Sequence, residues 1–245
     1  MKYRHRILKK KSVRTEWLPV ILLALLLCPQ ARAQSTTFFL PEVDTDIRLT
    51  SNIRLELQGK VAIEEGDFYR ATLGPSIEFN FRPLKKLKDI TIFDVDDMKC
   101  MPVMLSIGYR YLPSGTGPFT NRFEPILTLH IPAPGQLLIT DRNRADLDWS
   151  KGSYQWRYRN RITIERRVTV HSYHPAPYAS AEFLYESPYS KWASARLYSG
   201  CLLPLNKHLQ LDPYYEHENN TGKSPNRQTN AGGLTLSLYF PPYKP

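Results

Sequence analysis

Apolar and polar side chains alternate with a period of two along most of the chain. In the segment 157–167 the odd positions hold Arg157, Arg159, Arg161, Thr163, Glu165 and Arg167, whereas the even positions include Ile162 and Ile164. This alternation predicts a β-strand with one charged face and one apolar face. A soluble sheet would bury the apolar face, whereas a membrane barrel turns it towards lipid and lines its lumen with the charged face.

The same alternation recurs in a series of runs of about ten residues, the length that a tilted strand needs to cross a bilayer. The clear runs are 53–64, 70–82, 103–111, 122–131, 137–149, 157–167, 179–186, 192–203, 208–218 and 231–240. A shorter run, 44–50, adds an eleventh strand, and 36–40 is the candidate for a twelfth. The pattern predicts an all-β fold, a transmembrane antiparallel β-barrel of about 10–12 strands, with ten or twelve favoured because bacterial barrels prefer even numbers.

The connections between these runs differ in length and composition. Asn52, residues 132–135 and residues 204–207 mark tight turns, whereas 113–121 and 219–230 are longer and polar. Short turns on the periplasmic side and longer loops on the outer side are typical of outer-membrane barrels. The segment 83–101 is long where a short turn is expected, and we interpret it as a small periplasmic flap within one barrel domain, 34–245.

The N-terminus has the features of a secretory signal peptide. A basic region precedes the apolar core Leu18–Leu27, which is too short to span a bilayer as a helix, and Ala31-Arg32-Ala33 is a small-x-small cleavage site. We therefore predict that residues 1–33 are removed and that the remaining chain resides in the bacterial outer membrane.

Removal of the signal peptide changes the charge of the protein. The whole chain carries a net charge of +10, but residues 1–33 hold eight basic residues and one acidic residue, so residues 34–245 carry only +3. This balance gives no support to nucleic-acid binding. Cys100 and Cys201 remain, and the sequence leaves open whether they pair or stay as isolated thiols. No Cys/His spacing indicates a metal site, and no cofactor is expected.

Aromatic residues concentrate near the predicted strand ends, where membrane barrels carry interfacial girdles. The final run, Leu234, Leu236, Leu238 and Phe240, ends in an aromatic residue. It is similar to the C-terminal signal that the barrel-assembly machinery recognises, although the tail 241–245 departs from that pattern. The expected partners are therefore this machinery and outer-membrane lipid.

Four segments carry a resemblance to a known family. They are Ile107–Tyr111 with its Tyr-Arg-Tyr sequence, Trp156–Arg161 with alternating arginines, residues 177–185, and residues 209–215 with paired tyrosines. Over most of 44–240 the chain resembles the outer-membrane barrels of domain-of-unknown-function family 2490. The resemblance implies an outer-membrane barrel of ten to twelve strands and implies no activity.

The alternation also predicts which charged side chains face the lumen. They are Arg110, Arg122, Glu124, Arg142, Arg144, Asp146, Asp148, Arg157, Arg159, Arg161, Glu165, Glu182, Arg196, Asp212 and Glu216. One reading is a cross-strand ion-pair network that fills a narrow structural barrel. The other is an arginine-lined pore for small anions, because rings of arginine select anions.

Two further classes of protein are alternatives. A lipid-modifying outer-membrane hydrolase would need a nucleophile beside an oriented base, and Ser172 between His171 and His174 is the nearest arrangement. These residues fall in a Pro-rich turn, so we predict no catalytic residue and no enzyme. A soluble periplasmic β-barrel that binds a ligand is the other alternative, and the charge on one face of nearly every strand argues against it.

Overall fold

The structure is a computed structural model that describes residues 34–81, 96, 99, 101–222 and 225–241. The signal peptide predicted at 1–33, most of the flap predicted at 83–101, and Cys100 lie outside these residues. Cys201 is a free thiol among the described residues. Within the same part of the chain, no helix is long and apolar enough to cross a membrane.

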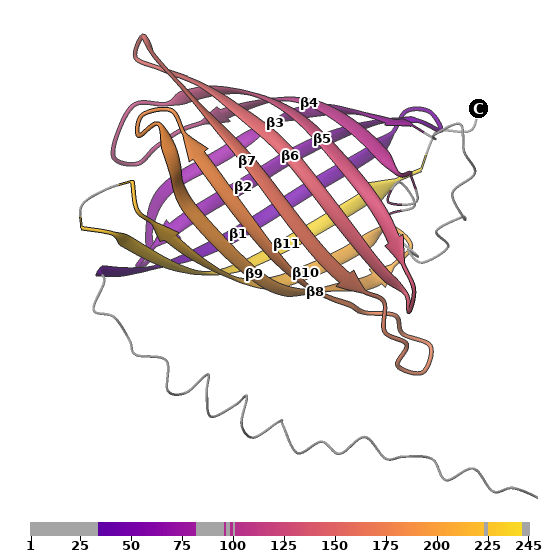
Figure 1. Cartoon of the computed structure of the whole chain (residues 1–245). Coiled ribbons are helices and arrows are strands. Elements are labelled where there is room, and N and C mark those ends of the chain that lie inside the picture. Colours follow the sequence, from indigo (N-terminus) through magenta and orange to yellow (C-terminus); the bar gives the residue numbers. More distant parts are fainter. Residues whose placement is uncertain (1–33, 82–95, 97–98, 100, 223–224, 242–245) are drawn as a thin grey trace, which may run out of the picture. The chain divides into compact units, whose positions relative to one another are not determined.

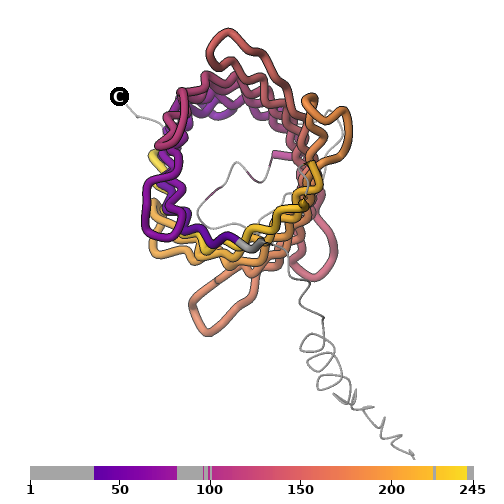
Figure 2. The backbone as a smooth tube through the Cα atoms, turned by 90° about the vertical axis from the view of Figure 1, so that its left-hand side faces the viewer, coloured from indigo at the N-terminus to yellow at the C-terminus, as the bar shows by residue number. Residues whose placement is uncertain are grey.

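Within the described residues, eleven strands form one closed barrel (Figures 1 and 2). The strands are β1 (Gln34–Arg48), β2 (Ile53–Glu64), β3 (Asp67–Phe81), β4 (Val103–Leu112), β5 (Thr120–Ala133), β6 (Leu137–Ser150), β7 (Ser153–Arg166), β8 (Ala176–Glu186), β9 (Lys191–Asn206), β10 (Leu209–Asn220) and β11 (Arg227–Phe240). Each strand pairs in antiparallel fashion with its neighbours in sequence, and β1 closes the ring by pairing in parallel with β11. The fold is thus the predicted β-barrel.

The strand number is odd, between the ten and twelve that the sequence favours. The two short runs 36–40 and 44–50 are parts of one strand, β1, which continues through Pro41. Continuous pairing with β11 from Gln34 to Ile47 accounts for this, because it aligns both runs on one neighbour. With eleven strands, the first and last run in the same direction and must close the barrel in parallel.

The two faces of the wall have opposite polarity. On β5 the side chains of Arg122, Glu124 and Thr128 are buried, whereas Leu127 and Ile131 are 41% and 50% exposed. Successive residues of a strand point to opposite faces, so the polar side chains fill the interior and the large apolar ones cover the outside. This is the reverse of a soluble barrel.

A small polar cluster interrupts the apolar exterior on β6 and β7. The hydroxyl of Tyr158 donates to Oδ1 of Asn143 at 2.5 Å, and Nδ2 of Asn160 donates to Oδ1 of Asp141 at 2.7 Å. Nδ2 of Asn143 also donates to Oδ2 of Asp141 at 3.2 Å. These groups satisfy one another, which lowers the cost of placing them among apolar side chains.

The ends of the barrel can be told apart by their connections. Three short connections, 49–52, 134–136 and 207–208, lie at one end, which we call the turn end, together with the C-terminal end of β11. The loops 113–119 and 221–226 lie at the other, the loop end, as the sequence predicts. The separation is incomplete, because the loop end also has tight turns at 65–66 and 151–152 and the turn end carries 167–175.

Two tyrosine rings lie over glycines of neighbouring strands inside the barrel. A Cβ atom on Gly233 would lie 2.0 Å from Cζ of Tyr214, and one on Gly200 would lie 2.6 Å from the hydroxyl oxygen of Tyr178. Any side chain at either glycine would displace the ring. These glycines therefore give the tyrosines room to lie against the wall and leave a space in the lumen beside them.

Candidate functional site

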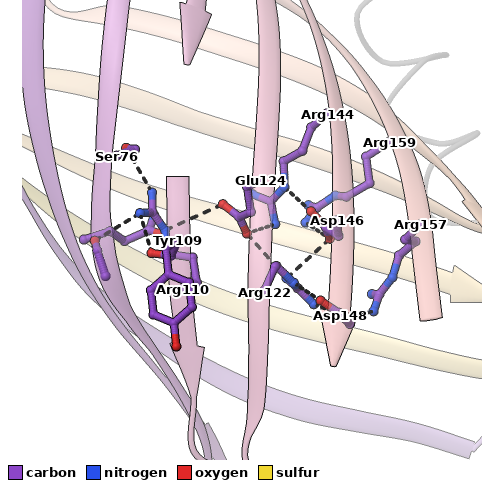
Figure 3. Close-up of polar contacts among 12 residues, drawn as sticks. Ser76, Tyr109, Arg110, Arg122, Glu124, Arg144, Asp146, Asp148, Arg157 and Arg159 are labelled. Carbon is purple, nitrogen blue, oxygen red and sulfur yellow. Dashed lines mark hydrogen bonds and ion pairs between the residues drawn. The ribbon is translucent and has the colours of Figure 1, made fainter. Parts of the chain in front are cut away.

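A network of arginines and carboxylates covers the interior wall from β4 to β10, and Figure 3 shows the part of it on β4 to β7. Its first centre is Asp146 on β6, whose side chain is fully buried. Its carboxylate hydrogen-bonds to Arg144, and its Oδ2 lies 3.3 Å from Nη1 of Arg122 and 3.6 Å from Nη1 of Arg159. One carboxylate thus joins three strands, because strand register places these inward residues at neighbouring heights.

Glu182 on β8 is a second centre of the network. Its Oε2 lies 2.8 Å from Nη2 of Arg159 and 3.7 Å from Nη1 of Arg196, and its Oε1 lies 3.2 Å from Nε of Arg161. The hydroxyl of Tyr198 donates to Oε2 at 3.1 Å, and its ring lies under the guanidinium of Arg161, 4.2 Å from ring centroid to Cζ. Three arginines therefore share one buried carboxylate.

Glu124 on β5 links the network to β4. Its Oε1 lies 2.8 Å from Nη2 of Arg144 and its Oε2 lies 3.6 Å from Nε of Arg110 (Figure 3). Arg122 beside it binds Asp148 in a bidentate manner, at 2.5 and 2.8 Å. Bidentate pairs fix the guanidinium plane, so the arginine heads of this wall are held in defined positions.

The structure places the fifteen residues predicted to line the lumen as follows. Arg110, Arg122, Glu124, Asp146, Arg159, Glu165, Glu182 and Glu216 are buried, and Arg142, Arg144, Asp148, Arg157, Arg161, Arg196 and Asp212 are half-buried. Most belong to the one network. Glu165 lies apart from it with Lys99, Asp212 accepts from the hydroxyl of Tyr178 at 3.0 Å, and Arg142 has no ion pair with any described residue.

Sequence reasoning named no interior residue on β1 to β3. Nζ of Lys60 lies 2.9 Å from Oε2 of Glu42 and donates to the hydroxyl of Tyr214 at 2.9 Å, which joins β1, β2 and β10. Nη2 of Arg110 lies 3.2 Å from Oε2 of Glu56. The sequence could have indicated these residues, because Glu56 and Lys60 fall on the same face of the alternating run 53–64.

At the turn end, described residues of the β3–β4 connection contact opposite walls. Oδ1 of Asp96 lies 2.9 Å from Nη1 of Arg54 on β2, and Nζ of Lys99 lies 3.0 Å from Oε2 of Glu165 on β7. β2 and β7 are five positions apart in the ring of eleven strands. Burial alone would lower the pKa of Lys99, but Glu165 and Asp96 raise that pKa above its ordinary value.

The interior contains a cavity of about 360 Å³. Its lining extends from Asn220 and Arg227, at the loop end, to Tyr178 and Asp212 further inside. Its basic lining residues are Lys60, Arg70, Arg122, Arg142, Arg144, Arg159, Arg161, Arg196 and Arg227, and its acidic ones are Glu42, Asp212, Glu216 and Glu218. The surface of the cavity is therefore strongly basic, although the wall behind it contains many carboxylates.

The residues that the sequence analysis considered for catalysis do not line this cavity. His171 and Ser172 lie exposed in the connection between β7 and β8, away from the interior. Within the described ranges, no group of three His, Cys, Asp or Glu residues is arranged to hold a metal ion. The cavity offers guanidinium, ammonium and hydroxyl groups, which is a set suited to binding an anion.

Comparison with known proteins identifies a family. A family model described as "Protein of unknown function (DUF2490)" matches residues 101–229, which include β4 to β10 and the start of β11. This is the family that the Tyr-Arg segments resemble, and the match contains most of the arginine network. No curated protein matches the chain.

Proposed function

This chain belongs to the DUF2490 family of proteins of unknown function, and we propose that it is an outer-membrane β-barrel whose arginine-lined lumen takes up small anions from the loop end. No named relative assigns a role, so the proposal is argued from the faces of the barrel and from the charges of its cavity.

Insertion into a membrane is supported by the exterior of the barrel. Large apolar side chains, such as Leu127 and Ile162, are exposed all round the wall. Aromatic pairs gather near the loop end, including Trp149 with Tyr154 and Trp156 with Tyr185. An apolar band bordered by aromatic residues is typical of barrels in the outer membrane. In water the same surface would favour aggregation.

The single observation that supports the proposed uptake of anions is the positive charge of the cavity surface. Nine basic and four acidic side chains line it among the residues that the structure describes. Carboxylates such as Asp146 and Glu182 hold the arginine heads in place but do not line the cavity. Pre-positioned guanidinium groups bind anions without reorganisation, and arginine-lined pores select anions.

The geometry supports a binding chamber rather than the narrow anion pore that was one of the two predictions. The described turn-end residues Arg54, Glu78 and Glu165 do not line the cavity and are engaged in ion pairs. An anion that enters at the loop end would therefore meet a basic chamber and then a region filled with paired charges. The ion-pair network would also serve the structural role that was the other prediction.

Location is tested by cell fractionation and by gel mobility. A folded outer-membrane barrel should sediment with the outer membrane and should run differently on a gel before and after heating in detergent. Recovery of the protein in the soluble periplasm, or an unchanged mobility, would refute the membrane assignment.

Uptake of anions is tested on the purified barrel in detergent. Phosphate should raise the unfolding temperature relative to chloride at equal ionic strength, because a ligand that binds only the folded state stabilises it. Equal unfolding temperatures in both salts would refute uptake. Planar-bilayer recordings should show no steady current, and a sustained anion-selective current would replace the chamber with a pore.

A further inference from the structure

Two of the arginines that line the cavity differ from all the others. Arg70 on β3 and Arg142 on β6 have no carboxylate within 4 Å among the described residues, whereas every other lining arginine has at least one. Arg227, for example, lies 3.1 Å from Glu64, measured from Nη2 to Oε1. The network therefore leaves two positive charges uncompensated on one cavity.

Arg142 is the stronger candidate for contact with a ligand. It lies on the inward face of β6, where its cross-strand partner is Arg161, and Arg144 is the next inward residue along β6. Its Nε is buried and has no hydrogen-bond partner among the described residues. A buried N–H without a partner is costly, and so is an uncompensated charge in the interior. Since the side chain is half-buried and lines the cavity, an anion bound there would compensate its charge.

Arg70 adds a second unpaired charge nearer the loop end. Its guanidinium lies near the ring of Tyr69, whose centroid is 5.9 Å from Cζ of Arg70. It lines the same cavity as Arg122 and Arg196. A carboxylate of the protein thus compensates those two arginines, but Arg70 has none among the described residues.

We propose that Arg142 binds the phosphate group of a small organic phosphomonoester, and that Arg70 adds its uncompensated charge to the same cavity. The proposal rests on the proposed uptake of anions and names the ligand class. A phosphate monoester carries a charge of about −1.5 to −2 at neutral pH, which matches two uncompensated cations. Its oxygens also accept parallel N–H bonds from a guanidinium group.

The organic part of the ligand is inferred from the remainder of the cavity. A volume of about 360 Å³ is larger than a phosphate ion needs and lies within the range of small-molecule sites. Phe38, Leu40, Tyr69 and Leu112 line it on the side of β1, β3 and β4. These side chains offer apolar and aromatic surface to a group attached to the phosphate.

The experiment is calorimetric titration of the barrel, full length after signal removal, in detergent at constant ionic strength. The probes are phenyl phosphate and inorganic phosphate. Phenyl phosphate should bind more tightly than inorganic phosphate. Arg142→Gln should weaken its binding about tenfold or more, as expected for loss of a charged hydrogen bond, and Arg70→Gln should weaken it several-fold.

Arg166→Gln is the matched control, because Arg166 is an exposed arginine at the end of β7 that does not line the cavity. The affinity of this variant for phenyl phosphate should stay within about twofold of the parent, since solvent screens a charge outside the cavity. Arg142→Lys keeps the charge but loses the planar fork, so it should show an intermediate affinity and serves if Arg142→Gln does not fold.

The outcomes separate the two proposals. Absence of any anion binding by the parent protein would overturn the uptake of anions itself. Phenyl phosphate binding that is unchanged in Arg142→Gln and Arg142→Lys would overturn the assignment of this site alone. Equal affinity for inorganic and phenyl phosphate would overturn the organic part of the ligand.

Discussion

Replacement of Glu182 by Gln gives the sharpest test of the ion-pair network. The side chain of Glu182 is 4% exposed and meets Arg159, Arg161 and Arg196, whose side chains are 11%, 27% and 19% exposed. Glutamine has nearly the same shape, so the substitution removes the charge and leaves the packing. Three guanidinium groups would then surround a neutral amide.

The expected loss in the free energy of unfolding follows from the burial of Glu182 and its partners. Loss of one partner of a buried ion pair costs about 3–5 kcal/mol, because the remaining charge is left uncompensated. The bidentate contact of Arg159, in which Nε donates to Oε1 at 3.1 Å and Nη2 donates to Oε2 at 2.8 Å, provides the largest share. Arg196 also contacts Glu216 and Glu218, so its charge remains compensated. We therefore expect a loss of about 3–5 kcal/mol in the free energy of unfolding.

The assay is urea unfolding of the barrel in lipid vesicles, followed by tryptophan fluorescence. The matched control is Glu64→Gln, which removes the single partner of Arg227 in a pair whose side chains are 28% and 34% exposed. Solvent screens such a pair, so its loss should cost no more than about 1 kcal/mol. A change below about 1 kcal/mol for Glu182→Gln, or equal losses for both variants, would refute the view that buried carboxylates hold the arginine wall.

Three further predictions concern the exterior, the interior packing and the turn end. Leu127→Arg, at the middle of β5, should lower the free energy of unfolding by about 2–4 kcal/mol if this face meets lipid; a change within about 0.5 kcal/mol, as at a water-exposed site, would count against the membrane. Gly233→Val should lower the temperature of the heat-induced mobility shift, because its Cβ would overlap the ring of Tyr214, and Tyr214→Ala in the same chain should restore part of it. Because the pKa of Lys99 is raised above 10.5, the Lys99–Glu165 pair should stabilise the folded barrel fully below pH 10.5 and should lose this effect at higher pH. The unfolding curves of the parent and of Lys99→Met should therefore approach each other at high pH. Curves that stay equally far apart would contradict this.

The strand pattern and the two faces of the wall could be predicted from the sequence. Arg159 points inward and Ile162 outward because side chains alternate along any extended strand, whatever lies beside it. Charged residues occupy one face and apolar residues the other over each run, so the inward side chains could be predicted for each strand separately. The residues missed on β1 to β3, such as Lys60, followed the same rule.

Strand number depended on closure of the ring. The runs 36–40 and 44–50 look separate because Pro41 stands between them, and proline usually marks the edge of a strand. Pairing of the whole segment with β11 makes them one strand. Whether two ends of a sheet meet is a property of all eleven strands, which no local pattern contains.

The sequence by itself determined that this protein alternates charge and apolar surface on opposite faces of short strands, because that period is a local property of the backbone. Only the tertiary structure decided which arginines have a carboxylate beside them. Asp146 is opposite Arg157 in register yet contacts Arg122, Arg144 and Arg159, whereas Arg142 on the same strand has no carboxylate partner in the part of the chain that the structure describes. Ion pairing depends on distances across strands and across the lumen, so the proposed phosphate site could be recognised only from the structure of the closed barrel.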